Sequence, residues 1–221
     1  VITMSFLFIG CGNTKDNTDT KLINLEYFFR NPEKTKFTLS PKGDYLAYLA
    51  PYDNRMNIFI QKVGSDSPLS LTSVTDRNIN EYYWANNTHI LYLKDTGGDE
   101  NFKLYSVDVN GEEKELLGCP NVRVRIVDLL ESLEDEVIVS MNKLNPQVFD
   151  PYRLNITTGK LTQLAKNPGN IQTWMADHNG KLRIAITADG TDKTVLYRDN
   201  ENQEFKPILT TSWKESLRPQ Y

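Results

Sequence analysis

Few residues in this sequence have the chemistry of a nucleophile, a proton carrier or a soft-metal ligand. The 221 residues include only two cysteines, Cys11 and Cys119, and two histidines, His89 and His178. The strained G-x-S-x-G turn that exposes a catalytic serine in α/β-hydrolases does not occur, and neither histidine stands in a context typical of a triad partner. We therefore assign no catalytic residue to this chain, and we expect no metal site and no cofactor.

One polar segment, Gly97-Gly98-Asp99-Glu100-Asn101, does carry neighbouring carboxylates. Asp99 and Glu100 could attract a cation or a peptide amine, or contact a substrate as part of a gating loop. The same residue types also form polar turns between strands, because glycine and asparagine tolerate the backbone conformations that a tight reversal needs. Asp99 and Glu100 are therefore the candidate site residues, as substrate-gating residues or as turn residues.

The bulk composition is that of a globular protein. Hydrophobic residues make up 39% of the chain and charged residues 24%, which gives enough apolar surface for a packed core. With 25 Lys and Arg against 29 Asp and Glu, the net charge is −4. Bulk charge therefore excludes nucleic acid as an expected partner.

The N-terminal segment 1–11 is typical of an export signal. Its apolar run VITMSFLFIG is too short to cross a bilayer, which takes about 20 residues. The run ends in Leu7-Phe8-Ile9-Gly10-Cys11, which resembles a bacterial lipobox with Phe8 in place of the usual leucine. We expect lipidation at Cys11, a lipid anchor to the membrane, and a polar tether and lead-in over 12–27. A buried strand with an incidental cysteine is the alternative.

This interpretation has two consequences for the protein. A lipidated Cys11 implies export to the bacterial cell envelope, as a periplasmic or membrane-anchored lipoprotein. The basic region of a signal is missing and the chain starts at Val1, so we expect that the sequence begins inside the signal.

The remainder of the chain repeats. Apolar runs recur with a nearly fixed spacing of 44, 47 and 45 residues when they are aligned on Leu46, Ile90, Val137 and Leu182. A second run follows each of these after a polar turn, with spacings of 46, 48 and 44 residues on Phe59, Tyr105, Arg153 and Tyr197. Periods of about 40 to 50 residues with several short strands in each indicate β-propeller blades.

We therefore predict an all-β fold, a partial β-propeller over 28–221 with about four blades of four-stranded antiparallel sheet. The blades are expected at about 36–75, 80–118, 122–165 and 171–210, and the start of a further blade at 212–221. The only sign of helix is one possible short turn at 128–136.

Two local patterns refine this prediction. Val122-Arg123-Val124-Arg125-Ile126 alternates strictly, so apolar side chains should line one face of a strand and two arginines the other. Asn110-Gly111 predicts a two-residue hairpin turn, because both residues can adopt positive φ.

Three stretches resemble the propeller of a known peptidase family. They are FFRNPEKTKFTLSPKGDYLAYLAPYDNRMNIFIQ (28–61), WANNTHILYLKDTGGDENFKLYSVDVNGEEKELL (84–117) and NPQVFDPYRLNITTGKLTQLAKNPGNIQTWMADHNGKLRIAIT (145–187). Features outside the repeat, such as NPEKT, DNRMN and GGDEN, occur in order. Together they are similar to the N-terminal propeller of bacterial prolyl oligopeptidase family serine peptidases, a group that includes dipeptidyl aminopeptidases and acylaminoacyl peptidases.

The resemblance implies an architecture of seven or eight blades followed by an α/β-hydrolase domain, of which this chain would be a fragment without the hydrolase domain. It implies the substrate-gating propeller region of an exported serine peptidase that hydrolyses short peptides, with the catalytic residues outside this sequence. The alternative is a non-catalytic envelope propeller of the TolB type that binds a protein partner. The sequence makes no prediction of the oligomeric state.

Overall fold

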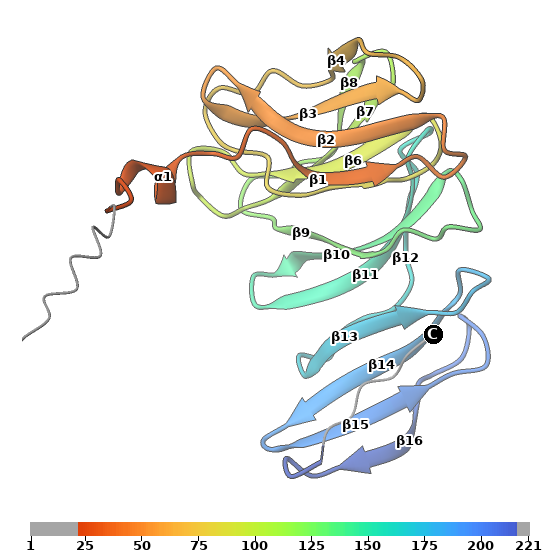
Figure 1. Ribbon diagram of the computed structural model, residues 1–221. Helices are drawn as coiled ribbons and strands as arrows, with labels where there is room; N and C mark the ends of the chain where they lie inside the picture. The colour runs from red at the N-terminus through yellow and green to blue at the C-terminus, as the bar shows by residue number, and fades with distance from the viewer. Residues whose placement is uncertain (1–21, 216–221) are drawn as a thin grey trace, which may run out of the picture. The chain divides into compact units, whose positions relative to one another are not determined.

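The computed structural model describes residues 22–215, so the expected lipidation site Cys11 lies outside the described residues. The chain divides into two compact parts, Val1–Arg30 and Asn31–Tyr221. In the first part the described residues form one short helix, α1 (Glu26–Phe29), which the sequence did not indicate (Figure 1). Between residues 22 and 215 no helix has the length and apolar character needed to cross a bilayer.

The described residues of the second part form four antiparallel sheets of four strands each. We call them blades 1 to 4. Blade 1 contains β1 (Thr35–Leu39), β2 (Tyr45–Tyr52), β3 (Arg55–Lys62) and β4 (Pro68–Ser70). Blade 2 contains β5 (Tyr82–Trp84), β6 (His89–Lys94), β7 (Lys103–Asp108) and β8 (Glu113–Leu117). Blade 3 contains β9 (Val124–Asp128), β10 (Glu136–Asn145), β11 (Val148–Asn155) and β12 (Leu161–Gln163). Blade 4 contains β13 (Ile171–Ala176), β14 (Leu182–Asp189), β15 (Asp192–Tyr197) and β16 (Lys206–Thr211).

Within every blade, strands that are neighbours in the sequence are neighbours in the sheet (Figure 1). This up-and-down order is that of propeller blades. The all-β fold of four-stranded antiparallel blades predicted from the sequence is confirmed.

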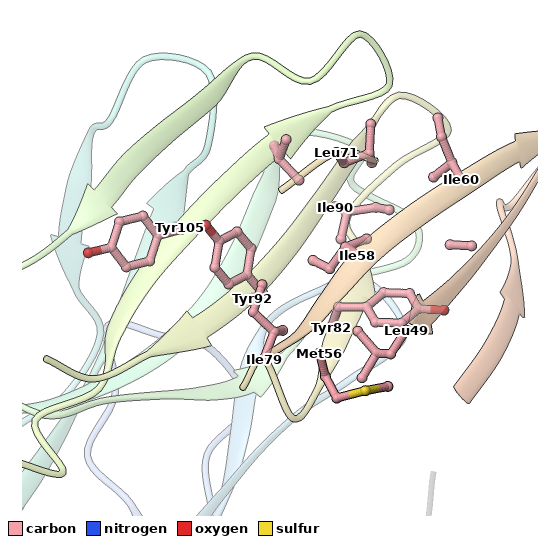
Figure 2. Packing of buried hydrophobic residues seen from close by; sticks show 12 residues of the cluster. Leu49, Met56, Ile58, Ile60, Leu71, Ile79, Tyr82, Ile90, Tyr92 and Tyr105 are labelled. Carbon is pink, nitrogen blue, oxygen red and sulfur yellow. The ribbon is translucent and has the colours of Figure 1, made fainter. Parts of the chain in front are cut away.

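Apolar side chains of consecutive blades pack together in three clusters. The first combines blades 1 and 2 and includes Ile58, Ile90 and Tyr92, which are all fully buried (Figure 2). The second combines blades 2 and 3, and the third combines blades 3 and 4. Because each cluster draws on two neighbouring blades, the sheets pack face to face in the order of the chain.

Two arginines add polar connections between blades 3 and 4. Arg198 is buried and donates hydrogen bonds to the carbonyl oxygens of Leu182, at 2.8 Å, and of Leu164, at 3.3 Å. Arg153 on β11 pairs with Glu201 of blade 4 at 2.9 Å. Buried charge is tolerated at this junction because the guanidinium groups receive hydrogen-bond partners in exchange for water.

The segment 128–136 differs from the sequence-based expectation of a short helical turn. Leu130 has a positive φ of 52°, which a right-handed helix does not allow. The N–H of Leu133 donates to the carbonyl oxygen of Leu130 at 2.6 Å, and the N–H of Glu136 donates to that of Leu133 at 3.0 Å. These successive reversals bring Leu130 and Leu133 into the cluster between blades 3 and 4, so tertiary burial decides the conformation.

The hairpin at Asn110-Gly111 also differs from the predicted two-residue turn. Gly111 has a positive φ of 89°, whereas Asn110 does not have a positive φ. The N–H of Asp108 donates to the carbonyl oxygen of Glu112 at 3.0 Å, so the loop contains three residues and ends in a left-handed glycine. The Asp108 carboxylate causes the difference, because it accepts hydrogen bonds from the backbone N–H of Asn110 and Glu112 at 2.9 and 2.8 Å.

Candidate functional site

A cleft of about 640 Å³ lies where blades 1, 2 and 3 meet. Its walls come from the start of β3, the β4–β5 connection, the end of β6 and the start of β9. Five cationic side chains line it: Arg55, Arg77, Lys94, Arg123 and Arg125. We call this site the arginine cleft.

The alternation of side chains at the start of strand β9, and in the two residues before it, places two of these arginines. Val122 and Val124 are buried in the cluster between blades 2 and 3, and successive side chains of a strand point to opposite faces. Arg123 and Arg125 therefore lie on the face that is turned away from that cluster. The shared face of the two arginines agrees with the sequence-based prediction, although the strand itself begins at Val124, two residues after the start of the alternating pattern.

The candidate residue Asp99 is part of the turn between β6 and β7. Its carboxylate accepts hydrogen bonds from the backbone N–H groups of Asn101, at 3.0 Å, and Thr96, at 3.3 Å. The hydrogen bond from the Asn101 backbone is the main cause of a pKa of Asp99 below its usual value. The side chain thus holds the loop together, and it does not line the arginine cleft.

The candidate residue Glu100 contacts a cleft residue instead of lining the cleft. Its carboxylate pairs with the Arg123 guanidinium at 2.9 Å, and its carbonyl oxygen accepts a hydrogen bond from Arg123 Nε at 2.7 Å. Glu100 therefore orients Arg123. Among residues 22–215, no group of three or more His, Cys, Asp and Glu side chains is placed to hold a metal ion. A gating role of Asp99 and Glu100 stays a prediction.

Some cations of the cleft have a carboxylate partner and others have none. Arg77 pairs with the buried Asp95 at 3.3 Å, and Arg123 pairs with Glu100. Arg55 donates from Nε to the carbonyl oxygen of Thr75 at 3.3 Å, and it forms no ion pair in the described part of the chain.

Arg125 likewise forms no ion pair within residues 22–215. Its guanidinium carbon lies 3.6 Å from the centroid of the Phe149 ring, close enough for a cation–π contact. Partial burial, together with the neighbouring charge of Arg123, lowers the pKa of Arg125 from its usual value. A guanidinium nevertheless stays protonated in proteins, so its positive charge persists without a carboxylate beside it.

Three carboxylates line the cleft as well, Asp76, Glu81 and Asp95. Asp95 pairs with Arg77, and Glu81 pairs with Lys36 at 3.2 Å. The hydrogen bond from the Tyr83 hydroxyl is the main cause of a lowered pKa of Glu81, and Lys36 adds to it. Unpaired cations therefore outnumber unpaired carboxylates in the cleft.

The rare reactive residues of the described chain lie outside this cleft. His89 Nδ1 lies 3.0 Å from the Thr88 hydroxyl, and the carbonyl oxygen of His178 accepts a hydrogen bond from Ser132 at 2.9 Å. Cys119 is exposed and forms no disulfide. The sequence-based reasoning missed Arg55, Arg77 and Lys94, because nothing in the sequence relates three cations that the fold brings together from separate blades.

Solved structures with the same fold are β-propellers. TolB from Acinetobacter baumannii matches with a TM-score of 0.51 and 16% identity, over 83% of this chain and 45% of that one. A chain from a structural study of two prolyl endopeptidases matches with a TM-score of 0.56 and 10% identity, over 80% of this chain and 28% of that one. These similarities identify the chain as part of a β-propeller.

Sequence comparison relates the chain to peptidases. It is 33% identical over 204 residues to dipeptidyl aminopeptidase BIII of Pseudoxanthomonas mexicana, which covers 87% of this chain and 30% of that protein. It is 25% identical over 209 residues to dipeptidyl peptidase family member 6 of Caenorhabditis elegans, which covers 90% of this chain and 28% of that protein. No family model matches the chain. The resemblance to the propeller portion of prolyl oligopeptidase family peptidases is confirmed, and the chain spans less than a third of these two relatives.

Proposed function

We propose that this chain is the substrate-gating propeller region of an exported serine peptidase that hydrolyses short peptides by acyl transfer. The observation that carries the proposal is the 33% identity to dipeptidyl aminopeptidase BIII over 87% of the chain. Acyl transfer would be carried out by residues outside this sequence. The contribution of the propeller would be to restrict which peptides reach them.

The arginine cleft supports a role in peptide selection. It combines charged donors with the partly exposed apolar side chains of Leu93 and Phe102. Binding sites for small molecules and peptides commonly have this mixture, in which apolar surface supplies affinity and a few polar groups supply orientation.

The test uses the product of the native gene, expressed with and without a Ser→Ala change in any G-x-S-x-G segment that its reading frame encodes. Cleavage of short chromogenic peptides is measured for both forms. Hydrolysis that depends on the serine is the expected result. A reading frame without such a segment, or a product that cleaves no peptide, would contradict the peptidase proposal.

A second candidate is a non-catalytic propeller of the TolB type that binds a protein partner. The fold similarity to TolB from Acinetobacter baumannii supports it. The same experiment separates the two, because a binding propeller requires no serine-dependent hydrolysis.

The proposed export rests on the lipobox-like segment that ends at Cys11. We propose that Cys11 is lipidated and anchors the protein in the bacterial cell envelope. Labelled palmitate supplied to a bacterial host should enter the native protein and should not enter a Cys11→Ser variant. Equal labelling of the two forms, or no labelling of either, would overturn this proposal.

A further inference from the structure

We propose that the arginine cleft binds a carboxylate of a peptide through Arg55 and Arg125. The inference rests on the proposed function only in taking a peptide as the ligand. It goes further by naming the group that the cleft recognises and the residues that recognise it.

The first argument is the unused hydrogen-bonding capacity of the two arginines. The Arg55 guanidinium uses only Nε, toward the carbonyl oxygen of Thr75, and the Arg125 side chain makes no hydrogen bond within residues 22–215. The terminal nitrogens of both guanidinium groups therefore lack protein partners. A planar guanidinium can bind a carboxylate with two parallel hydrogen bonds.

The second argument is the charge that surrounds them. The chain carries a net charge of −4, but the cleft leaves Arg55, Lys94 and Arg125 without carboxylate partners and only Asp76 without a cationic one. Arg77 and Arg123 are already paired, with Asp95 and Glu100. An anion that enters the cleft would therefore pair with Arg55, Lys94 or Arg125.

The third argument is that Arg125 is held in place before any ligand binds. It extends from strand β9, and its guanidinium lies 3.6 Å from the centroid of the Phe149 ring. Phe149 does not line the arginine cleft but a neighbouring hollow, which Arg125 lines as well. A side chain that is already positioned loses little conformational freedom when it binds a ligand, so the interaction is stronger.

The size and lining of the cleft favour a peptide over an inorganic anion. Its volume of about 640 Å³ and its apolar residues Leu93 and Phe102 exceed what a phosphate or sulfate ion can contact. Such sites occur where a ligand has both an apolar body and a charged group. The carboxylate can come from the C-terminus of the peptide or from an aspartate or glutamate side chain, and the experiment distinguishes these sources.

The experiment measures binding of three N-acetylated tripeptides by titration calorimetry to the protein expressed from its native gene. The peptides are Ala-Ala-Ala with a free carboxylate, the same peptide as its C-terminal amide, and the amide of Ala-Asp-Ala. Mass spectrometry after each titration verifies that the peptide is intact. We expect the free acid to bind roughly tenfold or more tightly than its amide, since charge-assisted hydrogen bonds are the stronger kind.

The amide of Ala-Asp-Ala identifies the source of the carboxylate. Binding as tight as that of the free acid would assign recognition to any carboxylate, and binding as weak as that of the Ala-Ala-Ala amide would assign it to the C-terminus. Either result supports the inference when the free acid is preferred. Tighter binding of the Ala-Asp-Ala amide alone would assign recognition to a side-chain carboxylate. Equal binding of all three peptides, or no binding of any peptide, would overturn the inference.

Substitutions place the recognition at the cleft. Arg55→Met and Arg125→Met should each reduce the preference for the free acid by roughly tenfold. Lys62→Gln is the matched control, because Arg55 and Lys62 are the two ends of β3 and Lys62 does not line the cleft. The control removes one positive charge and should leave the preference unchanged. A loss of equal size in Lys62→Gln would show that only overall charge matters, and would overturn the assignment.

Two safeguards keep the test decisive. Arg55 is exposed, so its substitution is informative even if Arg125→Met fails to fold, and the peptide comparison on the native protein needs no variant. Hydrolysis and carboxylate preference are separate readouts. Serine-dependent hydrolysis without the preference overturns this inference alone, whereas the preference without hydrolysis overturns only the peptidase proposal.

Discussion

Arg198 illustrates how single residues hold this fold together. Its guanidinium donates to the carbonyl oxygens of Leu182 at 2.8 Å and Glu201 at 3.1 Å, and its central carbon lies 4.4 Å from the Phe205 ring centroid. Burial lowers the pKa of Arg198, because a charged group loses hydration there. The carbonyl oxygens replace the water molecules that would hydrate the guanidinium. The guanidinium in turn supplies the hydrogen-bond donors that these carbonyl oxygens require.

We expect Arg198→Met to lower the free energy of unfolding by about 3 kcal/mol, because it leaves buried carbonyl oxygens without donors. Urea denaturation measures the change. Arg55→Met is the control, because Arg55 is exposed and makes one long hydrogen bond of 3.3 Å. It should cost less than about 0.5 kcal/mol. Similar losses in the two variants would contradict a structural role of the buried guanidinium.

Substitution of Gly98 is constrained by its left-handed backbone conformation and by the nearby side chain of Arg77. Its φ is +88°, and a Cβ atom added there would lie 3.2 Å from Nη1 of Arg77. Gly111 is a matched position, with a φ of +89° and its nearest neighbouring atom, the carbonyl oxygen of Leu71, at 3.9 Å. The two glycines share backbone strain and differ in crowding.

Both Gly98→Ala and Gly111→Ala should therefore lose about 1–2 kcal/mol for the left-handed backbone. Gly98→Ala should lose up to about 0.5 kcal/mol more, because the added methyl group would lie 3.2 Å from Nη1 of Arg77 and make this half-exposed side chain shift against its partner Asp95. Chemical denaturation of the two variants gives the difference directly. Equal losses would mean that the Arg77 side chain accommodates the methyl group without weakening its ion pair with Asp95.

At the scale of secondary-structure elements, the strands were predictable and two of the connections were not. The runs at Leu46, Ile90, Val137 and Leu182 repeat because each blade needs the same central strand, and all four runs are strands in the structure. The connections at Asn110 and Leu130 differ, because a capping carboxylate and a buried leucine decide them. Local propensity does not include such contacts.

The candidate site was predictable only in part, for a related reason. The alternation around Arg123 and Arg125 is a local pattern, so it predicted their shared face. Arg55 and Arg77 join them through the packing of three blades. Their proximity depends on contacts between distant parts of the chain, which no local pattern records.

Asp108 and Asp177 cap turns of similar local geometry, in the β7–β8 connection of blade 2 and in the β13–β14 connection of blade 4. Partial burial raises the pKa of Asp108, but hydrogen bonds from the backbone of Glu112 and from Asn110 lower it below the usual 3.8 overall. Burial opposes the shift at Asp177 as well, where hydrogen bonds from Arg183 and from backbone N–H groups lower the pKa. Both carboxyl groups therefore favour the charged form in the folded protein.

A lowered pKa in the folded state predicts acid sensitivity. The stabilisation is fully present above the unfolded pKa of about 4 and is lost as the pH falls through the lower folded pKa. Thermal unfolding should therefore shift to lower temperature between about pH 4 and pH 2. The double variant Asp108→Asn/Asp177→Asn should be less stable than the native protein at neutral pH. Its unfolding temperature should fall less between about pH 4 and pH 2.

Asp66→Asn is the control for this titration, because Asp66 lies in an exposed turn outside the blades' strands. It should follow the acid profile of the native protein. If the double variant also kept the native slope, the two capping carboxylates would not be the source of the acid sensitivity.

For the second part of the chain as a whole, the arrangement of the blades leaves apolar surface uncovered at both ends of the series. Phe37 is 54% exposed and lies against Tyr48, with ring centroids 5.4 Å apart, on the side of blade 1 that does not join the cluster with blade 2. On β16 of blade 4, Ile208 is 62% exposed and Leu209 49% exposed. In a propeller, neighbouring blades cover such surfaces, and exposed apolar patches favour association.

The chain of residues 1–221 is therefore expected to self-associate as its concentration rises, which sedimentation velocity measures across a dilution series. Phe37→Lys combined with Ile208→Lys should move association to roughly tenfold higher concentration or more, since burial of one large apolar side chain contributes about 1.5–3 kcal/mol. Thr191→Lys in the exposed β14–β15 turn adds the same kind of charge and should not change association. A chain that stays monomeric and unfolds in one cooperative transition at every concentration would show that these end surfaces are stable in water. The blades would then form a self-sufficient unit, in contrast to the mutual dependence expected of repeats that contact only their neighbours.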